Sequence, residues 1–297
     1  MDIWKIDLDL IFSIRIWYLS IWWISYEACK FNDMKKAVFT ITISIFVLLG
    51  CQTVVNKMAF HPDTKNVIPT NKLPENVKEI FVKTEDKIEI QTYFIPNKSS
   101  NKILIYFHGN AGNIGHRLSD LMQISQFGVN VLGVGYRGYG KSQGSPSEEG
   151  IYIDGKSALK YAINELGFTL EQVYIFGRSI GTTVAINTAQ RKNIAGLILV
   201  TPLTSGKDHA KASGLGLVSF LAGNSFNNIE KIPKIICPAL IIHGNKDRVI
   251  PFEMGVKIYE DIKTEKKFVK IEGAGHNDIS LIDKSIYWNS ILEFIRK

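Results

Sequence analysis

Two stretches of the chain match the pattern Gly-x-Ser-x-Gly, which can present a serine hydroxyl as a nucleophile on a tight turn. They are Gly140-Lys-Ser142-Gln-Gly144 and Gly177-Arg-Ser179-Ile-Gly181. A serine that attacks a carbonyl carbon needs a base, an acid that orients the base, and N–H donors for the oxyanion. The residues around each serine therefore decide which match can do this chemistry.

The second serine has the flanking sequence that such a turn requires. Ser179 follows the apolar run Val173–Phe176 and precedes the helix-compatible stretch Ile180–Gln190. Glycines two residues before and after it allow strand and helix to approach closely. Ser142 is followed by Gly144 and Pro146, which block a helix, so it is predicted to be a loop serine.

The first match overlaps a phosphate-binding pattern. Gly135 to Ser142 reads G-x-x-x-x-G-K-S. A phosphate loop needs its Lys-Ser pair to open a helix, whereas Gln143-Gly-Ser-Pro146 follows here, and the next helix start is Ser147-Glu-Glu149. No convincing apolar strand ends in a magnesium-binding Asp, so a nucleotide hydrolase is the least favoured alternative.

The best-placed base is His276, in the loop Gly273–Asp278 after the last predicted strand. The same region offers three acids. Asp247 follows the predicted strand 239–243 through a short turn, whereas Asp278 and Asp283 are expected to face solvent or to start the last helix. The chain order Ser179, Asp247, His276 is that of one known arrangement of the Ser-His-Asp triad. Solvated or structural roles are predicted for His61, His116, His209 and the strand-end His243.

Two backbone N–H groups are candidates for the oxyanion site. One belongs to Ile180, directly after the serine, and the other to Asn110 in His108-Gly-Asn110-Ala-Gly112. Glycines on both sides of Asn110 permit close backbone approach.

Short apolar runs alternate with longer helical patterns from residue 76 onward, which predicts an α/β fold. We expect eight strands in a mostly parallel sheet, with an antiparallel hairpin at its start and helices on both faces. The predicted strands are Glu79–Thr84, Ile88–Ile95, Lys102–Phe107, Val129–Gly135, Gln172–Phe176, Ala195–Val200, Ala239–His243 and Lys267–Ile271. The predicted helices span residues 115–127, 148–165, 180–190, 253–262 and 283–296, and residues 204–229 are predicted to form a small lid.

Composition excludes several classes of protein. Of the 297 residues 45% are hydrophobic and 21% charged, which is typical of a globular chain and not of a disordered one. The net charge of +7 is scattered, so nucleic acid is not an expected partner. The three cysteines show neither a disulfide framework nor zinc-site spacing, and no metal or cofactor is implied.

The first 50 residues look like targeting sequence. Residues 34–50 combine two lysines with an uncharged apolar run, as in a signal peptide. Leu48-Leu-Gly-Cys51 resembles the lipobox of bacterial lipoproteins, which implies a lipid on Cys51 and a membrane-anchored protein of the cell envelope. Residues 1–33 would be an upstream extension or a hydrophobic leader, and residues 51–75 a tether. The alternative is an N-terminal hydrophobic helix with an incidental cysteine.

Taken together, the motifs resemble the α/β-hydrolase superfamily, and most closely a membrane-associated group that includes palmitoyl-protein thioesterases and bacterial serine aminopeptidase-like hydrolases. The matching stretches run in family order: His108–Asn113, Tyr136–Gly140, Pro146–Glu148, Gly177–Gly181, Thr201–Ser205, His243–Asp247 and Gly275-His276. The resemblance implies Ser179 as nucleophile, Asp247 and His276 as its partners, and Asn110 and Ile180 as oxyanion donors. The chain departs from the family pattern at Gly135, where an Asp is usual. The sequence therefore does not indicate which acidic residue pairs with Arg137.

These observations predict a lipid-anchored serine hydrolase that cleaves carboxylic esters or thioesters of small or acylated substrates, with no obligate protein partner. Apolar lid residues, among them Leu215 and Phe220, could line an acyl pocket, face a membrane or pack on the sheet. A serine peptidase on the same triad is the main alternative. A non-enzymatic envelope scaffold is less favoured because binding alone does not require all three triad residues.

Overall fold

The computed structural model describes residues 38, 56 and 59–297. The chain divides into two compact units, residues 1–54 and 55–297, and every helix and strand named below lies in the second. The predicted leader, signal peptide and Cys51 lie outside the described residues. Within the part of the chain that is described, no helix is both long and apolar enough to cross a bilayer.

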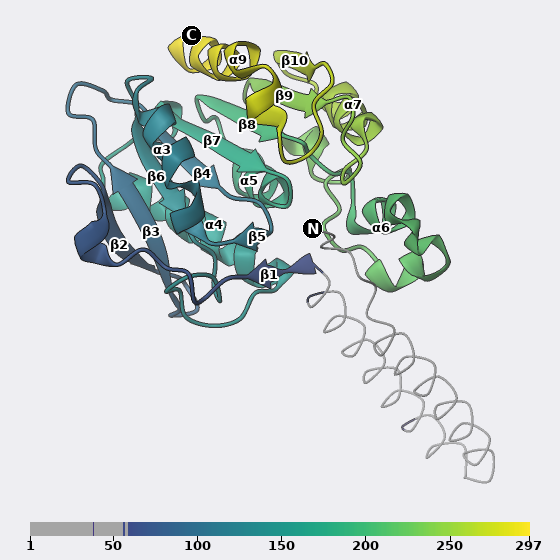
Figure 1. Cartoon of the computed structure of the whole chain (residues 1–297), viewed down its shortest axis with the longest axis horizontal. Coiled ribbons are helices and arrows are strands. Elements are labelled where there is room, and N and C mark those ends of the chain that lie inside the picture. Colours follow the sequence, from purple (N-terminus) through teal and green to yellow (C-terminus); the bar gives the residue numbers. More distant parts are fainter. Residues whose placement is uncertain (1–37, 39–55, 57–58) are drawn as a thin grey trace. The chain divides into compact units, whose positions relative to one another are not determined.

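An eight-stranded sheet forms the centre of the second unit, with strand order β10-β9-β8-β7-β4-β6-β3-β2 (Figure 1). The pairs from β6 through β4, β7, β8 and β9 to β10 are parallel, and β2 and β3 are antiparallel to their neighbours. All eight predicted strands are confirmed, with no end shifted by more than two residues. They are β2 (Lys78–Lys83), β3 (Glu89–Ile95), β4 (Ile103–Phe107), β6 (Asn130–Val134), β7 (Val173–Arg178), β8 (Gly196–Val200), β9 (Ala239–Gly244) and β10 (Lys266–Ile271).

Burial explains why these runs form strands. Every residue of β4, β6, β8 and β9 is buried, as expected for parallel strands covered on both faces. The edge strands β2 and β10 mix buried and exposed residues instead.

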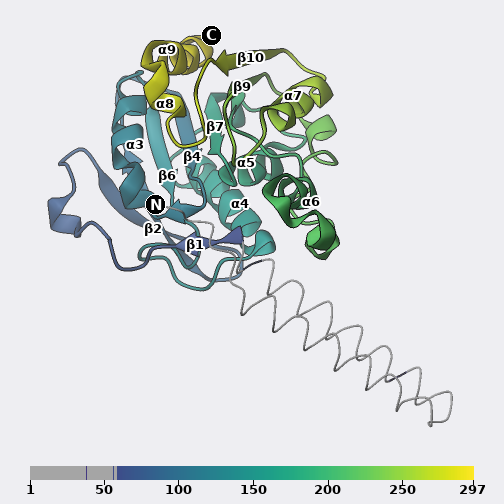
Figure 2. The same cartoon turned by 45° about the vertical axis from the view of Figure 1, so that its right-hand side comes forward.

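Helices cover both faces of the sheet, as Figure 2 shows. Apolar side chains of α3 (Leu118–Ser125) and α9 (Lys284–Arg296) belong to one core cluster, together with Tyr106 and Phe176. Those of α4 (Glu148–Asn164), α5 (Gly181–Ala189) and α7 (Phe252–Asp261) belong to the cluster on the other face. The helix predicted over residues 115–127 divides into a 3-10 turn, Ile114–Arg117, and α3.

The start of the domain differs from the expected tether over residues 51–75. Phe60 is only 5% exposed and packs edge-on against Phe226. The short strand β1 (His61–Pro62) pairs in parallel with β5 (Ala111–Gly112), which directly follows the proposed oxyanion donor Asn110. The packed domain therefore begins before residue 76, because this segment buries an aromatic side chain and pairs its backbone.

The open question of Arg137 is resolved by two carboxylates distant in sequence. Its guanidinium lies 2.6 Å from Asp86 and 2.8 Å from Asp154. Hydrogen bonds from Arg137 lower the pKa of Asp86 to about 2. A side chain at Gly135 would come within 2.9 Å of the Gln91 carbonyl, so the aspartate that is usual there has no space.

Residues 204–229 form a helical insertion between β8 and β9, at the position of the predicted lid (Figure 1). It contains α6 (Gly206–Ala210), a π turn (Lys211–Leu215) and a 3-10 segment (Gly216–Ala222). Asn228 closes its base by hydrogen bonds to Leu203 and Thr204. Phe220 is 57% exposed, so this side chain is available to an apolar ligand or surface.

Candidate active site

Ser179 lies on the sharp turn between β7 and α5, as its flanking sequence predicts. Its φ is +55°, in the left-handed region that non-glycine residues rarely adopt. Its backbone N–H donates to the Val200 carbonyl of β8 at 2.9 Å, which holds the strained turn against the sheet.

The two glycines of the motif are required by close packing. A Cβ at Gly177 would lie 2.5 Å from the Gly181 carbonyl oxygen, and one at Gly181 would clash with the carbonyl oxygens of Phe107 and His108. The helix, the strand and the loop after β4 thus meet at backbone distance around Ser179.

We expect Gly181→Ala to lower the free energy of unfolding by about 3 kcal/mol, because backbone atoms cannot move aside as a flexible side chain can. Urea unfolding of the full chain, followed by circular dichroism, measures this. The control is Gly216→Ala, where nothing lies within 4 Å of the new methyl group and the unfolding midpoint should stay within error. Equal midpoints for both variants would contradict the close packing described here.

His276 is brought to Ser179 by the loop after β10. Its Nε2 lies 3.0 Å from Ser179 Oγ and its Nδ1 lies 2.8 Å from Asp247 Oδ2. A carboxylate only accepts hydrogen bonds, so Nδ1 carries the proton and Nε2 is left as an acceptor facing the hydroxyl. This tautomer is the one that can take a proton from serine.

Asp247 lies on the turn after β9. Two backbone N–H groups and two imidazoles contact its carboxylate. Its Oδ1 accepts from the N–H groups of Val249 and Ile250, each at 2.8 Å. Burial by itself would raise the pKa of Asp247, but the imidazoles of His243 and His276 and the Ile250 N–H outweigh it, and the pKa is well below its ordinary value. The carboxylate is therefore ionised and fixed in orientation.

His243 has the structural role that its strand-end position predicts. It is fully buried, with Nε2 2.9 Å from the Ile250 carbonyl and 3.5 Å from Asp247 Oδ2. A side chain at Gly255 of α7 would collide with Nδ1 of this ring. His243 thus packs under the Asp247 turn rather than facing Ser179.

The loop predicted to supply the second oxyanion donor lies next to Ser179. A Cβ at Gly109 would be 3.4 Å from Ser179 Cβ. The Asn110 side-chain oxygen accepts from the His61 N–H at 2.8 Å and from the Tyr139 hydroxyl at 3.2 Å, which anchors the loop. Ile180 directly follows the serine and is the N-cap residue of α5.

His108 is a fully buried residue at the start of this loop. Burial lowers its pKa to about 3, against an opposing hydrogen bond with the Gly109 carbonyl. The neutral ring donates from Nδ1 to that carbonyl at 2.6 Å and packs against Tyr136 with centroids 4.4 Å apart and the rings tilted by 37°. It is therefore a packing residue and not a base.

His209 of α6, predicted to have a solvated or structural role, interacts electrostatically with the site. Burial lowers the pKa of His209, the nearby His276 imidazole lowers it further, and the Asp247 carboxylate opposes both. This insertion residue thus interacts electrostatically with both partners of Ser179. Because His209 lies outside any strand-end loop, no local sequence signal indicates this interaction.

Ser142 is a structural loop serine, as predicted. Its hydroxyl accepts from the Gln91 N–H at 2.8 Å and donates to the Gly135 carbonyl at 3.1 Å. Lys141 forms an ion pair with Glu79 at 2.7 Å. The phosphate-loop pattern therefore lacks both the following helix and an available lysine.

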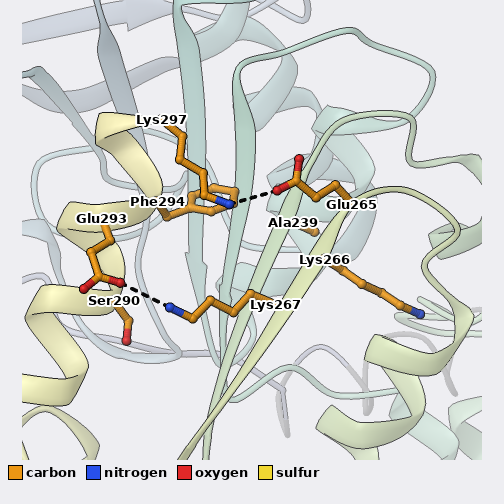
Figure 3. Close-up of a pocket in the computed structure, with 8 residues that line it drawn as sticks. All are labelled: Ala239, Glu265, Lys266, Lys267, Ser290, Glu293, Phe294 and Lys297. Carbon is orange, nitrogen blue, oxygen red and sulfur yellow. Dashed lines mark hydrogen bonds and ion pairs between the residues drawn. The ribbon is translucent and has the colours of Figure 1, made fainter.

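A cavity of about 280 Å³ lies away from Ser179, at the amino-terminal ends of β9 and β10 (Figure 3). Ala239 and Lys266 are the first residues of those strands, whereas Asp247 and His276 follow their carboxyl ends. The residues that line it form two ion pairs, Lys267–Glu293 and Lys297–Glu265. We do not associate this cavity with the chemistry of Ser179.

Comparison with known proteins agrees with this geometry. A family model described as Serine aminopeptidase, S33 matches residues 98–231. The chain is 37% identical over 191 residues to the alpha/beta hydrolase domain-containing protein aho-3 of Caenorhabditis elegans, covering 64% of this chain and 57% of that protein's length. It is 32% identical over 282 residues to protein bem46 of Schizosaccharomyces pombe, covering 91% of this chain and 94% of bem46.

The chain belongs to the alpha/beta hydrolase family. Its fold agrees with that of solved members: an esterase of Pyrococcus furiosus superimposes with a TM-score of 0.65 at 20% identity, covering 80% of this chain and 98% of that one. As an alpha/beta hydrolase it carries its serine, acid and histidine after β7, β9 and β10, at one edge of the parallel sheet.

Proposed function

We propose that this alpha/beta hydrolase is a serine hydrolase of carboxylic esters or thioesters, acting through an acyl-enzyme. The observation that carries the proposal is the unbroken chain of hydrogen bonds from Ser179 Oγ through His276 to Asp247. Each member is oriented as a nucleophile, a general base and an orienting acid must be.

In the first half-reaction Ser179 Oγ attacks the carbonyl carbon of the substrate while His276 Nε2 takes the hydroxyl proton. Asp247 stabilises the imidazolium that forms. The tetrahedral intermediate then collapses, the bond to the alcohol or thiol breaks, and Nε2 returns the proton to that leaving group. In the second half-reaction His276 takes a proton from water, hydroxide attacks the acyl-serine, and the carboxylic acid leaves as Ser179 regains its proton.

We assign the oxyanion to the backbone N–H groups of Asn110 and Ile180. The support is positional: both residues flank Ser179, and the close contact of Gly109 with Ser179 brings the Asn110 loop to the reacting atom. One such donor is commonly worth about 3 kcal/mol of transition-state stabilisation.

Esters or thioesters with apolar acyl groups fit this site better than peptides with a free amino terminus. Such a peptide would need an available carboxylate to bind its ammonium group. Two carboxylates near the insertion already have partners: Asp208 accepts from the Thr204 hydroxyl, and Glu148 accepts from the Phe226 N–H. The exposed Phe220 adds apolar surface.

We further propose that the chain is anchored to a cell-envelope membrane by a lipid on Cys51. This proposal rests on the lipobox-like residues 48–51 and the apolar run before them. Mass spectrometry of the amino terminus of the native protein tests it. A lipidated Cys51 is the expected terminus, and an unmodified Met1 contradicts the proposal.

The test of the activity uses the full chain and three matched substrate series: p-nitrophenyl esters and acyl thioesters from acetyl to palmitoyl, and aminoacyl p-nitroanilides. We expect turnover of the first two, with a chain-length optimum, and labelling of the Ser179 peptide by a fluorophosphonate. Cleavage of the anilides alone would replace this proposal with the peptidase alternative. No turnover and no labelling of folded protein would favour a binding scaffold.

A further inference from the structure

The side chain of Arg178, the last residue of β7, joins the serine turn to the histidine loop. Its Nη2 donates to the backbone carbonyl of His276 at 3.2 Å and to that of Asn277 at 3.3 Å. Arg178 directly precedes Ser179 in the chain. One residue therefore connects the strand that presents Ser179 to the backbone that presents the base.

Other hydrogen bonds of this loop are made within the loop or with the turn after β9. Gly275 donates to Asp278 within the loop, Gly273 donates to Asn245 after β9, and the Ala274 carbonyl accepts from Lys246. These bonds tie the loop to itself and to the turn that carries Asp247. They set the histidine relative to its acid, whereas Arg178 sets it relative to the serine.

Arg178 is partly buried at the carboxyl end of β7, and its charge acts on two buried tyrosines. Burial raises the pKa of the phenols of Tyr106 in β4 and Tyr287 in α9, and the Arg178 guanidinium opposes that rise in both. The Arg178 charge thus interacts electrostatically with two buried phenols from two elements. A planar guanidinium can present two N–H donors to adjacent carbonyls, as Nη2 does here, which a flexible ammonium does less well.

We propose that Arg178 is a positioning residue that sets the distance between His276 Nε2 and Ser179 Oγ. The inference rests on the proposed function for its catalytic consequence. Arg178 acts through the loop backbone and does not touch the substrate. Without it the loop keeps its contacts with Asp247 but can shift as a unit away from the serine.

The expected effect follows from how steeply proton transfer depends on geometry. A misplacement of 1 Å can lower a rate by about 100-fold. In the full chain, Arg178→Ala should lower kcat for a p-nitrophenyl ester by about 10- to 100-fold with KM within about twofold. Arg178→Lys, which keeps the charge, should retain more activity. Methylguanidinium at millimolar concentration should restore part of kcat to the alanine variant and leave the wild type unchanged.

The matched control is Arg296→Ala, which removes an exposed arginine from the last turn of α9 and should leave kcat and the unfolding midpoint unchanged. A normal kcat in Arg178→Ala overturns the proposal. So does a rise in KM that accounts for the whole loss, because it would place Arg178 on the substrate.

A measurement independent of turnover separates this inference from the proposed function. Amide hydrogen exchange over residues 272–278 should be faster in Arg178→Ala and Arg178→Lys than in the wild type, with exchange in the central strands unchanged. Unchanged exchange in the loop overturns the positioning role of Arg178 even if the enzyme is active. Faster exchange in a protein that shows no serine-dependent turnover supports the positioning role of Arg178 and rejects the proposed activity.

Discussion

Ser179→Ala is expected to lower kcat for ester hydrolysis by about 10⁶-fold, the scale seen when a triad serine is removed from a serine hydrolase. The alanine methyl group cannot form the acyl-enzyme, while the hydrogen bond from Ser179 N to Val200 uses backbone atoms and remains. The fold should therefore survive the change. Steady-state kinetics and fluorophosphonate labelling of the full chain measure the loss.

The second Gly-x-Ser-x-Gly match supplies the control. Ser142→Ala removes two hydrogen bonds, with Gln91 and Gly135, and should cost about 1–2 kcal/mol of stability while kcat changes less than twofold. Equal activity of wild type and Ser179→Ala would mean that another residue is the nucleophile. Loss of activity in Ser142→Ala without unfolding would reverse our assignment of the two motifs.

Asp247→Asn is expected to lower kcat by about 10⁴-fold, because it reverses the tautomer of His276. The two N–H groups of Val249 and Ile250 hold Oδ1, so the new amide NH₂ must replace Oδ2 and face His276 Nδ1. Nδ1 would then have to accept a hydrogen bond, and the proton would move to Nε2. A protonated Nε2 cannot take the proton of Ser179.

Asp283→Asn is the matched control, since Asp283 only accepts from Ile286 N at the start of α9 and asparagine caps helices equally well. Activity of this variant should be unchanged. Because the folded pKa of Asp247 is lowered, its contribution to stability is complete above about pH 4 and is lost as pH falls toward the folded value. The difference in unfolding free energy between wild type and Asp247→Asn should therefore shrink below about pH 4. A constant difference would contradict an ionised Asp247.

Local sequence carried enough information to predict the elements and the choice of serine. The alternation of apolar runs with helical patterns depends on burial within each segment, and β4 and β8 are in fact buried throughout. The turn at Ser179 is also encoded locally, since Gly177 and Gly181 are needed within four residues of each other. Asp247 and His276 could be proposed because loops after neighbouring parallel strands meet at one sheet edge.

Contacts between distant segments could not be predicted in the same way. Nothing around Arg137 indicates Asp86, 51 positions away, as a partner, and a pattern of polar residues before residue 76 does not predict the pairing of β1 with β5. Whether a side chain reaches across the sheet depends on how the strands are ordered. The strand order of the sheet places β4 between β6 and β7, and sequence periodicity does not predict this order.

The sequence by itself determined the alpha/beta architecture and was enough to propose Ser179 as nucleophile with Asp247 and His276 as its partners, because each follows from local periodicity or from chain order. Only the tertiary structure decided how these groups are held: the 3.0 Å approach of His276 to Ser179, the electrostatic interaction of His209 with His276 and Asp247, and the bond from Arg178 to the histidine loop. The physical reason is that hydrogen bonds require placement within a few tenths of an ångström. That placement arises from packing between segments up to 99 residues apart, which no local pattern encodes.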